Sequence, residues 1–178
     1  MRRLRYNVAM SLDGFIAGPN GEYDWIIFDS TFDFGALFRQ FDTVVMGRRT
    51  YETMLAAGQS PASLGMKAFV ISATLRTEEH PGVTILSSGV AEAVAEMKAQ
   101  PGKDIWLFGG GGLFRSLLDA GLVDSVEVAV NPVMIGSGIK VLPEGRRWPL
   151  CLTESEALPN GIVTMKYSVT ATSATGSG

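Results

Sequence analysis

A continuous apolar run followed at once by four glycines is the feature that most restricts how this chain can fold. The run is Ile105–Phe108, and Gly109 to Gly112 lead from it into a segment with apolar residues at helical spacing. A short apolar run without polar alternation predicts a strand that is covered on both faces, as in parallel sheets. The succession of buried strand, glycine loop and helix therefore favours an α/β fold with helices packed on a mostly parallel sheet.

Strand and helix patterns alternate along most of the chain. Strands are predicted at 4–10, 43–46, 68–72, 83–86, 105–108, 125–130, 152–157 and 163–169, with 132–135 continuing the strand before it past a kink. Helices are predicted at 34–41 after an Asp33 cap, at 50–57, between a Ser88 cap and Gly102, and from 113 to Gly121. Because the last strands follow one another without a helix, that edge of the sheet should be antiparallel.

Length and composition indicate one globular domain. The 178 residues are 46% hydrophobic and 19% charged, which suffices for a substantial core. We place the domain at residues 1–171 and expect a disordered tail at 172–178. The net charge of −3 argues against a nucleic-acid or membrane partner. No apolar run approaches the ~20 residues of a membrane helix, and the N-terminus lacks a signal-peptide pattern, which favours the cytoplasm.

The cysteine and histidine counts exclude several kinds of site. Cys151 and His80 are the only residues of their types. An internal disulfide, a cysteine zinc cluster and a histidine metal site are therefore excluded, and we expect no metal. His80 lies in a Glu-Glu-His-Pro-Gly turn pattern, which favours a surface position over a role in a serine–histidine–aspartate triad. We expect Cys151 to be a small buried residue.

The four glycines at 109–112 are the first candidate for ligand binding. Backbone without side chains lets a ligand approach closely, and the N–H groups at the start of the following helix can hold phosphate oxygens. A turn that needs glycine only for steric reasons is the alternative, but four in succession favour a ligand cradle. Phe114 and Arg115 stand where a G-x-G-x-x-G fingerprint needs glycine, and Leu113 stands where a P-loop needs lysine.

A second junction between a buried strand and a helix carries Gly47, Arg48, Arg49 and Thr50. Arginine at a helix N-terminus opposes the helix dipole unless an anion lies nearby, and guanidinium groups bind phosphate through paired hydrogen bonds. Two solvated arginines on a surface turn are the alternative. Together with the glycine segment, the pattern favours phosphate binding.

The exit from the first strand is a third candidate. The strand carries the small residue Ala9 and runs through Asp13-Gly14 into an apolar pair, Phe15 and Ile16. A loop of this kind can close over a flat ring and exclude water, which favours hydride transfer. The residues alone favour a plain exit from the strand, so this candidate depends on the other two.

Taken together and in this order, four segments resemble the dihydrofolate reductase superfamily. The likeness is greatest to the reductase domain of bifunctional riboflavin-biosynthesis enzymes and its stand-alone relatives. The segments lie at 9–14, 46–52, 108–111 and 132–138. The resemblance implies a three-layer fold with a central sheet of about eight strands. It also implies an NADPH cofactor and association into a homodimer.

The resemblance further implies which residues contact NADPH. Those at the arginine junction, Gly47, Arg48, Arg49 and Thr50, would hold the cofactor phosphates. Those at the glycine junction, Gly109, Gly110, Gly111 and Gly112, would pass close to the pyrophosphate, with Leu113 and Phe114 beside it. Ser72 and Thr74 would contact the adenosine end, and Ala9 and Ile16 would line the nicotinamide pocket.

The chain departs from folate reductases at the acidic residue that binds the pteridine ring. The matching position falls near Ser30, and neither Asp29 nor Asp33 is in register with it. This disfavours folate and favours another small pyrimidine-like or pterin-like heterocycle. Asp29, Asp33, Asp13 or an ordered water would donate the proton. An acid in an aromatic pocket would have a raised pKa, which suits proton donation near neutral pH.

The favoured function is hydride transfer from NADPH to such a heterocycle. Within the family, the reduction of 5-amino-6-(5-phosphoribosylamino)uracil in riboflavin biosynthesis is the most similar reaction. Dihydrofolate reduction is one alternative, and a non-catalytic NADP-binding module that has lost its substrate is another. An interaction domain whose glycines serve only turns is the third.

Overall fold

The structure is a computed structural model that describes residues 1–28 and 32–170. Its strands are β1 (Leu4–Ser11), β2 (Phe15–Ala17), β3 (Phe41–Gly47), β4 (Lys67–Ile71), β5 (Thr84–Leu86), β6 (Asp104–Gly109), β7 (Ser125–Asn131), β8 (Ile139–Lys140), β9 (Leu150–Ala157) and β10 (Val163–Val169). The α-helices are α1 (Phe34–Phe38), α2 (Arg48–Ala56), α3 (Val90–Ala99) and α4 (Gly111–Asp119), and short 3₁₀ helices lie at Pro61–Leu64 and Thr77–Glu79.

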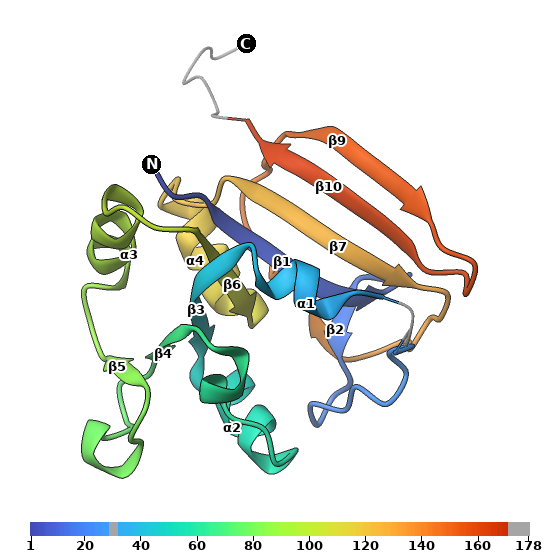
Figure 1. The fold of residues 1–178 in the computed structure, drawn as a ribbon. Helices are drawn as coiled ribbons and strands as arrows, with labels where there is room; N and C mark the ends of the chain where they lie inside the picture. The colour runs from blue at the N-terminus through green and yellow to red at the C-terminus, as the bar shows by residue number, and fades with distance from the viewer. Residues whose placement is uncertain (29–31, 171–178) are drawn as a thin grey trace.

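The strands form one large sheet and one small one (Figure 1). The large sheet has eight strands in the order β5-β4-β3-β6-β1-β7-β10-β9, and β2 pairs with β8 beside it. Every pairing from β5 to β7 is parallel. The strand β10 is antiparallel to both β7 and β9. The predicted α/β fold, with a mostly parallel sheet and an antiparallel C-terminal edge, is confirmed.

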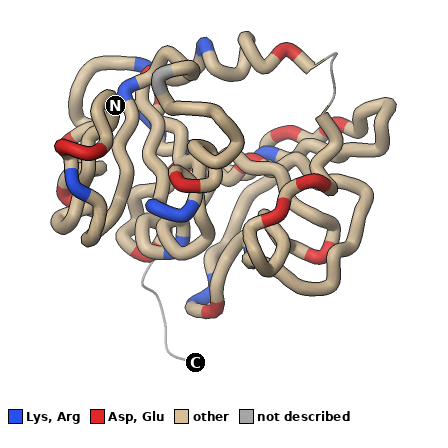
Figure 2. The backbone as a smooth tube through the Cα atoms, turned by 90° about the horizontal axis from the view of Figure 1, so that it is seen from below, with Lys and Arg blue, Asp and Glu red and all other residues tan. Residues whose placement is uncertain are grey.

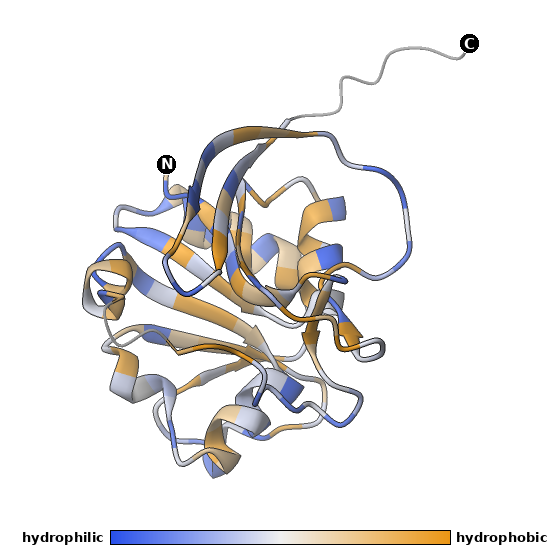
Figure 3. Ribbon diagram, turned by 90° about the vertical axis from the view of Figure 1, so that its right-hand side faces the viewer, coloured by the Kyte–Doolittle hydropathy of each residue, from blue (hydrophilic) through white to orange (hydrophobic). Residues whose placement is uncertain are grey.

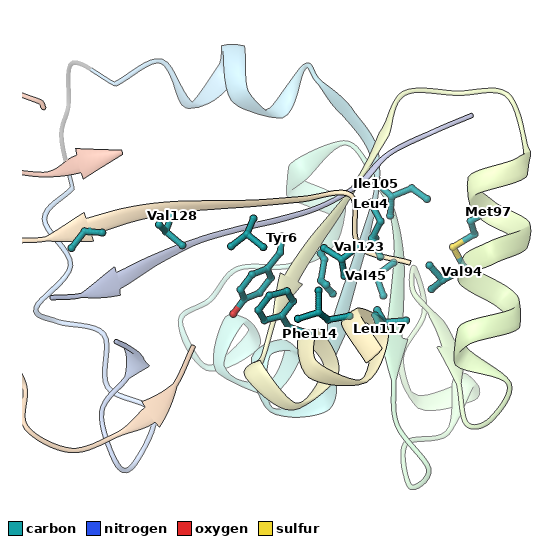
Figure 4. Packing of buried hydrophobic residues seen from close by; sticks show 14 residues of the cluster. Leu4, Tyr6, Val45, Val94, Met97, Ile105, Phe114, Leu117, Val123 and Val128 are labelled. Carbon is teal, nitrogen blue, oxygen red and sulfur yellow. The ribbon is translucent and has the colours of Figure 1, made fainter. Parts of the chain in front are cut away.

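Helices cover both faces of the parallel part of the sheet, and each face has its own apolar cluster. On one face, α3 and α4 pack against β1 and β6, and the Tyr6 ring stacks on Phe114 with centroids 3.8 Å apart (Figure 4). On the other face, α1 and α2 pack around Trp106, whose ring centroid lies 5.5 Å from that of Phe38. The predicted core role of Trp106 is confirmed, since it is 5% exposed.

The structure corrects several expected boundaries. Phe41 opens β3 and does not belong to α1, which ends at Phe38. The cap of α3 is Gly89 at φ 61°, not Ser88, because the chain enters this helix through a left-handed residue. Residues 132–135 are not a strand and do not prolong β7. The predicted tail at 172–178 lies outside the described residues.

The structure differs from the expectations for two single residues, Cys151 and His80. Cys151 is exposed on β9, not buried, because β9 is the edge strand of the sheet. His80 is half-buried, and its ring nitrogen Nδ1 lies 3.2 Å from the Tyr51 hydroxyl. The histidine therefore packs against α2 and does not project freely from a turn.

Charge and hydropathy are distributed as in an ordinary globular protein. Basic and acidic positions are interspersed along the backbone (Figure 2), and apolar residues run along the central strands (Figure 3). Across residues 1–28 and 32–170, no helix is both long and apolar enough to span a membrane. In the same part of the chain, no three histidine, cysteine or acidic side chains are grouped as metal ligands would be.

Candidate functional site

The arginine junction and the glycine junction lie side by side. They follow β3 and β6, which are neighbours in the sheet, with Met46 paired to Gly109. A Cβ atom on Gly47 would lie 3.7 Å from the carbonyl oxygen of Gly109 and 3.7 Å from the amide nitrogen of Gly110. Two segments about 60 residues apart in the sequence thus meet at one edge of the sheet, within reach of a single ligand.

The helices that leave these two strands diverge. After β3, α2 joins the apolar cluster that contains Trp106, whereas α4, after β6, joins the cluster that contains Tyr6. The two helices therefore cover opposite faces. In open α/β sheets, ligands bind at such a point, outside the carboxyl ends of the strands.

The helix N-termini at this point have no side-chain caps. Gly47 caps α2 and Gly110 caps α4, and neither offers a side chain to the first-turn amides. The first amides of a helix have no partner within the helix, so they are satisfied by water or by a ligand. Two such N-termini at one crevice form a favourable environment for linked phosphates.

The four glycines of the second junction have different reasons to be glycine. Gly109 has φ +119°, which disfavours any side chain, and the peptide bond that joins it to Gly110 is cis. Gly111 packs against β8, since its Cβ would lie 2.4 Å from the carbonyl oxygen of Lys140. Gly112 has no atom within 4 Å of its Cβ position. Steric need thus explains Gly109 and Gly111 but not Gly112.

The two arginines of the first junction are held differently. Arg48 donates from Nε to Glu52 at 2.7 Å and from Nη1 to the Thr74 hydroxyl at 2.7 Å. Arg49 is exposed and has no side-chain partner within the described residues. The Thr50 hydroxyl lies 3.8 Å from the Cβ position of Gly110. Arg48 is therefore oriented toward β4, while Arg49 is an uncompensated cation at the start of α2.

Ser72 and Thr74 lie at the end of β4, next to β3 in the sheet. The Ser72 hydroxyl is buried and accepts hydrogen bonds from the amides of Thr74 and Leu75, at 3.2 and 3.0 Å. These bonds shape the turn and place the exposed Thr74 beside Arg48. Ser72 therefore positions the turn, and Thr74 and Arg48 form its polar surface.

Ala9 lies near the end of β1, the strand on the other side of β6. It is half-exposed and pairs with Ala129 of β7, so two small side chains lie side by side on the sheet. Ile16 lies on β2, which pairs with β8 and is half-exposed. From β4 to β1, the predicted contact residues follow the sheet edge over three strand spacings, about 14 Å.

Two predicted cofactor neighbours sit at the start of α4. Phe114 is 3% exposed and stacked on Tyr6, so its ring belongs to the core, and its amide donates to the Gly110 carbonyl at 3.0 Å. Leu113 is half-exposed and packs against the same core. The helix period places Phe114 inward together with Leu117 and Leu118.

Of the three predicted proton donors, the structure describes Asp13 and Asp33, and each has other partners. Asp29 lies outside the described residues. Asp33 caps α1 by accepting from the Ala36 amide at 2.8 Å, and it contacts Arg39. Asp13 accepts from the amides of Ile135 and Gly136, at 3.2 and 2.7 Å. A hydrogen bond from Ser11 and these amide bonds lower the pKa of Asp13, which disfavours a role as acid near neutral pH.

A buried polar network on β1 and β7 was not predicted from the sequence. Arg5 donates two hydrogen bonds to the Glu127 carboxylate, both 2.7 Å long, and Asn7 donates to the same carboxylate at 3.1 Å. The network lies on the face of the sheet that also carries Ala9, because strand residues alternate. Charged residues within two otherwise apolar strands were the available signal, but their pairing depends on the strand register.

Comparisons with known proteins identify the family of the chain. The family model of the RibD C-terminal domain matches residues 2–164. YyaP of Bacillus subtilis (strain 168), described as uncharacterized, is 30% identical and is aligned over 93% of this chain and 94% of its own.

Two solved structures show the same fold. A putative riboflavin biosynthesis protein from Shewanella sp. PV-4 superposes with a TM-score of 0.81 at 23% identity, covering 95% of this chain and 99% of its own. Dihydrofolate reductase from Enterococcus faecalis, complexed with NADP(H), superposes with a TM-score of 0.69 at 18% identity, covering 95% and 97%. The chain therefore belongs to the RibD C-terminal domain family, and it shares its fold with dihydrofolate reductase.

Proposed function

We propose that this protein is an NADPH-dependent reductase that transfers hydride to a small heterocyclic substrate. The observation that carries the proposal is the contact between the two junctions, Gly47–Thr50 and Gly109–Gly112, at one edge of the sheet. Membership of a reductase family supports the same reading.

The residues at the junctions fit the phosphates of a dinucleotide. Two uncapped helix N-termini offer amide donors, and the exposed Arg49 adds a cation without an ion-pair partner in the described part of the chain. A Cβ at Gly47 would point toward the backbone at Gly109 and Gly110, so glycine there leaves space for a ligand. Amides, cation and open backbone together favour a pyrophosphate.

Arg48 and Thr74 support a preference for NADPH over NADH. Their hydrogen bond joins the start of α2 to the turn after β4, at the end of the series where the adenosine would lie. A guanidinium fixed in this position suits a 2′-phosphate, which NADH lacks. The neighbouring Glu52 holds the guanidinium through Nε and Thr74 holds it through Nη1, which leaves Nη2 available.

The hydride would come from the nicotinamide of NADPH, and the protein would bind, orient and desolvate the reactants. Ala9 and Ala129 are small, so a flat ring can approach the sheet closely at the end of β1 and β7. The strand β2, paired with β8, borders this region and would limit the access of water. Since Asp13 and Asp33 have other partners, we propose water as the immediate proton donor.

The substrate is proposed to be pyrimidine-like or pterin-like. The aminopyrimidine ribosyl phosphate reduced in riboflavin biosynthesis is the favoured member of this class, and dihydrofolate is the alternative. A non-catalytic NADP-binding module is a second candidate function. The engagement of Asp13 and Asp33 in structural hydrogen bonds favours it, because neither is free to protonate a substrate.

Titration with NADPH, NADP⁺ and NADH, followed by tryptophan fluorescence, tests the proposal. We expect saturable binding of both phosphorylated cofactors and weaker binding of NADH. Oxidation of NADPH, followed by absorbance with a panel of aminopyrimidines and pterins, then separates a reductase from a binding module. Failure of all three cofactors to bind would reject both functions.

A further inference from the structure

The polar network on β1 and β7 joins the side-chain amide of Asn7 to Glu127 and Arg5, and Arg5 also contacts Gln40 and Asp104. Glu127 is 5% exposed and Arg5 is 7% exposed, whereas Asn7 is half-buried. Buried ion pairs contribute little net stability when compared with apolar packing, so stability alone does not account for this one. This one holds the orientation of the Asn7 amide.

The orientation of that amide follows from the charge of its partner. Burial raises the pKa of the Glu127 carboxyl, but hydrogen bonds and charge attraction from Arg5, with further bonds from Ser125 and Asn7, outweigh burial and lower the pKa overall. Glu127 is therefore a carboxylate that only accepts hydrogen bonds. Asn7 must turn its Nδ2 donor toward Glu127, at 3.1 Å, and its Oδ1 acceptor away from it.

The carboxylate is itself fixed from several sides. Arg5 binds it through two nitrogens and is in turn held by Gln40 at 2.8 Å and by the Phe41 ring, 4.7 Å from the guanidinium carbon. Ser125 donates to the same carboxylate at 2.9 Å. Each group of the network limits the freedom of the next, so the Asn7 amide is held in one orientation before any ligand arrives.

Asn7 lies on the face of β1 where the substrate ring is proposed to bind. Asn7 and Ala9 lie on the same face of β1, two residues or about 7 Å apart. Within the described residues Asn7 Oδ1 has no hydrogen-bond partner, and it is not among the buried side-chain atoms that lack one. It is therefore accessible from outside the protein.

The geometry points to Asn7 as a substrate-positioning residue that accepts a hydrogen bond from a ring N–H or amino group of the heterocycle. This inference rests on the proposed function, because it takes the nicotinamide to lie near Ala9. It narrows the substrate class to heterocycles with an N–H donor on the edge that meets β1. Glu127 and Arg5 act through Asn7 and do not contact the substrate.

The test measures binding of two probe compounds to the protein saturated with NADP⁺. The first probe, 2,4,6-triaminopyrimidine, carries N–H donors, and the second, 2,4,6-trimethylpyrimidine, has the same shape without them. Calorimetry of the wild type, Asn7→Leu, Glu127→Gln and Thr164→Val gives the dissociation constants. Thr164 of β10 pairs with Ala129 of β7 and therefore lies on the same face of the sheet. It serves as the control.

We expect the triamino probe to bind the wild type and Asn7→Leu to weaken it about tenfold, as loss of one hydrogen bond with an unpaired donor implies. Glu127→Gln should also weaken it, since a glutamine can donate to Asn7 and reverse the amide. Thr164→Val should leave binding unchanged, and the trimethyl probe should not distinguish wild type from Asn7→Leu. A structural role alone would change the melting temperature or NADP⁺ affinity but not the difference between the two probes.

Three outcomes oppose these expectations. If NADP⁺ does not bind the wild type, the proposed function fails and the inference fails with it. If NADP⁺ binds but the triamino probe does not, the inference fails while the cofactor site stands. If both bind and the folded Asn7→Leu and Glu127→Gln variants keep wild-type affinity for the probe, Asn7 does not position the ring.

Discussion

Substitution of Gly47 by alanine separates ligand binding from folding at the junction of β3 and α2. Gly47 has φ −78° and ψ 162°, which alanine adopts without strain, and it provides no side-chain cap. The added Cβ would lie 3.7 Å from the nearest atoms of Gly109 and Gly110, an ordinary contact distance. We therefore expect Gly47→Ala to change the free energy of unfolding by less than about 1 kcal/mol.

The same methyl group should have a large effect on cofactor binding. It would occupy the space between the two junctions, where the pyrophosphate is proposed to meet the helix amides. Loss of one hydrogen bond to a charged group corresponds to about 1.5–3 kcal/mol. The dissociation constant for NADPH should therefore rise roughly ten- to hundredfold.

Urea denaturation and a fluorescence titration with NADPH measure the two quantities on the same protein sample. Gly35→Ala is the matched control, because Gly35 lies in α1 and its Cβ would meet only the side-chain ends of Asp33 and Arg39, at 3.0 and 3.1 Å. It should leave NADPH affinity unchanged. Gly47→Ala with wild-type affinity for NADPH would refute a phosphate site between the junctions.

Further substitutions give four more expected results. In fluorescence titrations, Arg48→Ala should weaken NADPH binding about tenfold and leave NADH binding nearly unchanged, whereas Arg49→Ala should weaken the binding of both cofactors. Equal effects on NADPH and NADH binding in both variants would contradict a contact between Arg48 and the 2′-phosphate. Gly111→Ala should lower the free energy of unfolding in urea by about 1–3 kcal/mol, because its Cβ would lie 2.4 Å from the Lys140 carbonyl oxygen. Unchanged stability would show that the backbone at the end of β8 yields freely. Because the folded pKa of Glu127 is lowered below its ordinary value of 4.5, its contribution to stability is present above that pH and is lost as the pH falls through the folded pKa. Glu127→Gln should thus lower the free energy of unfolding by about 3 kcal/mol at pH 7, and this variant should lose less stability as the pH falls. A wild-type pH profile of stability in this variant would contradict the lowered pKa of Glu127. We also propose a homodimer through the apolar face of β9 and β10, where Leu150 and Leu152 are 42% and 53% exposed. Leu152→Glu should then be a monomer in sedimentation experiments, and a monomeric wild type would exclude the dimer.

The sequence allowed prediction of the parallel sheet and of the meeting of the two junctions, for a local reason. In both segments a buried apolar strand ends at glycine and a helix follows, and the ends of parallel strands meet at one edge of the sheet. The order of the strands, with β3 beside β6, was not predicted and is known only from the structure. Apolar runs alone do not specify which strands are neighbours.

Local boundaries failed where two patterns share a residue. Phe41 continues the helical spacing of Phe34 and Phe38 and also opens the buried strand β3, and burial in the sheet prevails. Ser88 is a good cap by residue type, but Gly89 next to it enters the helix from a left-handed conformation that serine disfavours. Cys151 was expected in the core because of its residue type. Its exposure follows from the place of β9 at the edge of the sheet, which depends on the order of all the strands.

The Asn7–Glu127 contact lay beyond prediction because its members are 120 residues apart. Their pairing depends on the register between β1 and β7, and a shift by one residue would place Glu127 on the other face. The roles of Asp13 and Asp33 depend similarly on backbone amides that surround them after folding. Residue type alone suggested acids for catalysis, whereas the folded chain uses both to hold its own backbone.

A crystal structure of the protein grown with NADP⁺ is the most direct test of the site. We predict one dinucleotide across the sheet edge, with its pyrophosphate between the amides of Gly47–Thr50 and those of Gly109–Gly112 and its nicotinamide beside Ala9. A dinucleotide that touches only one of the two junctions, or that binds elsewhere on the protein, would contradict the assignment.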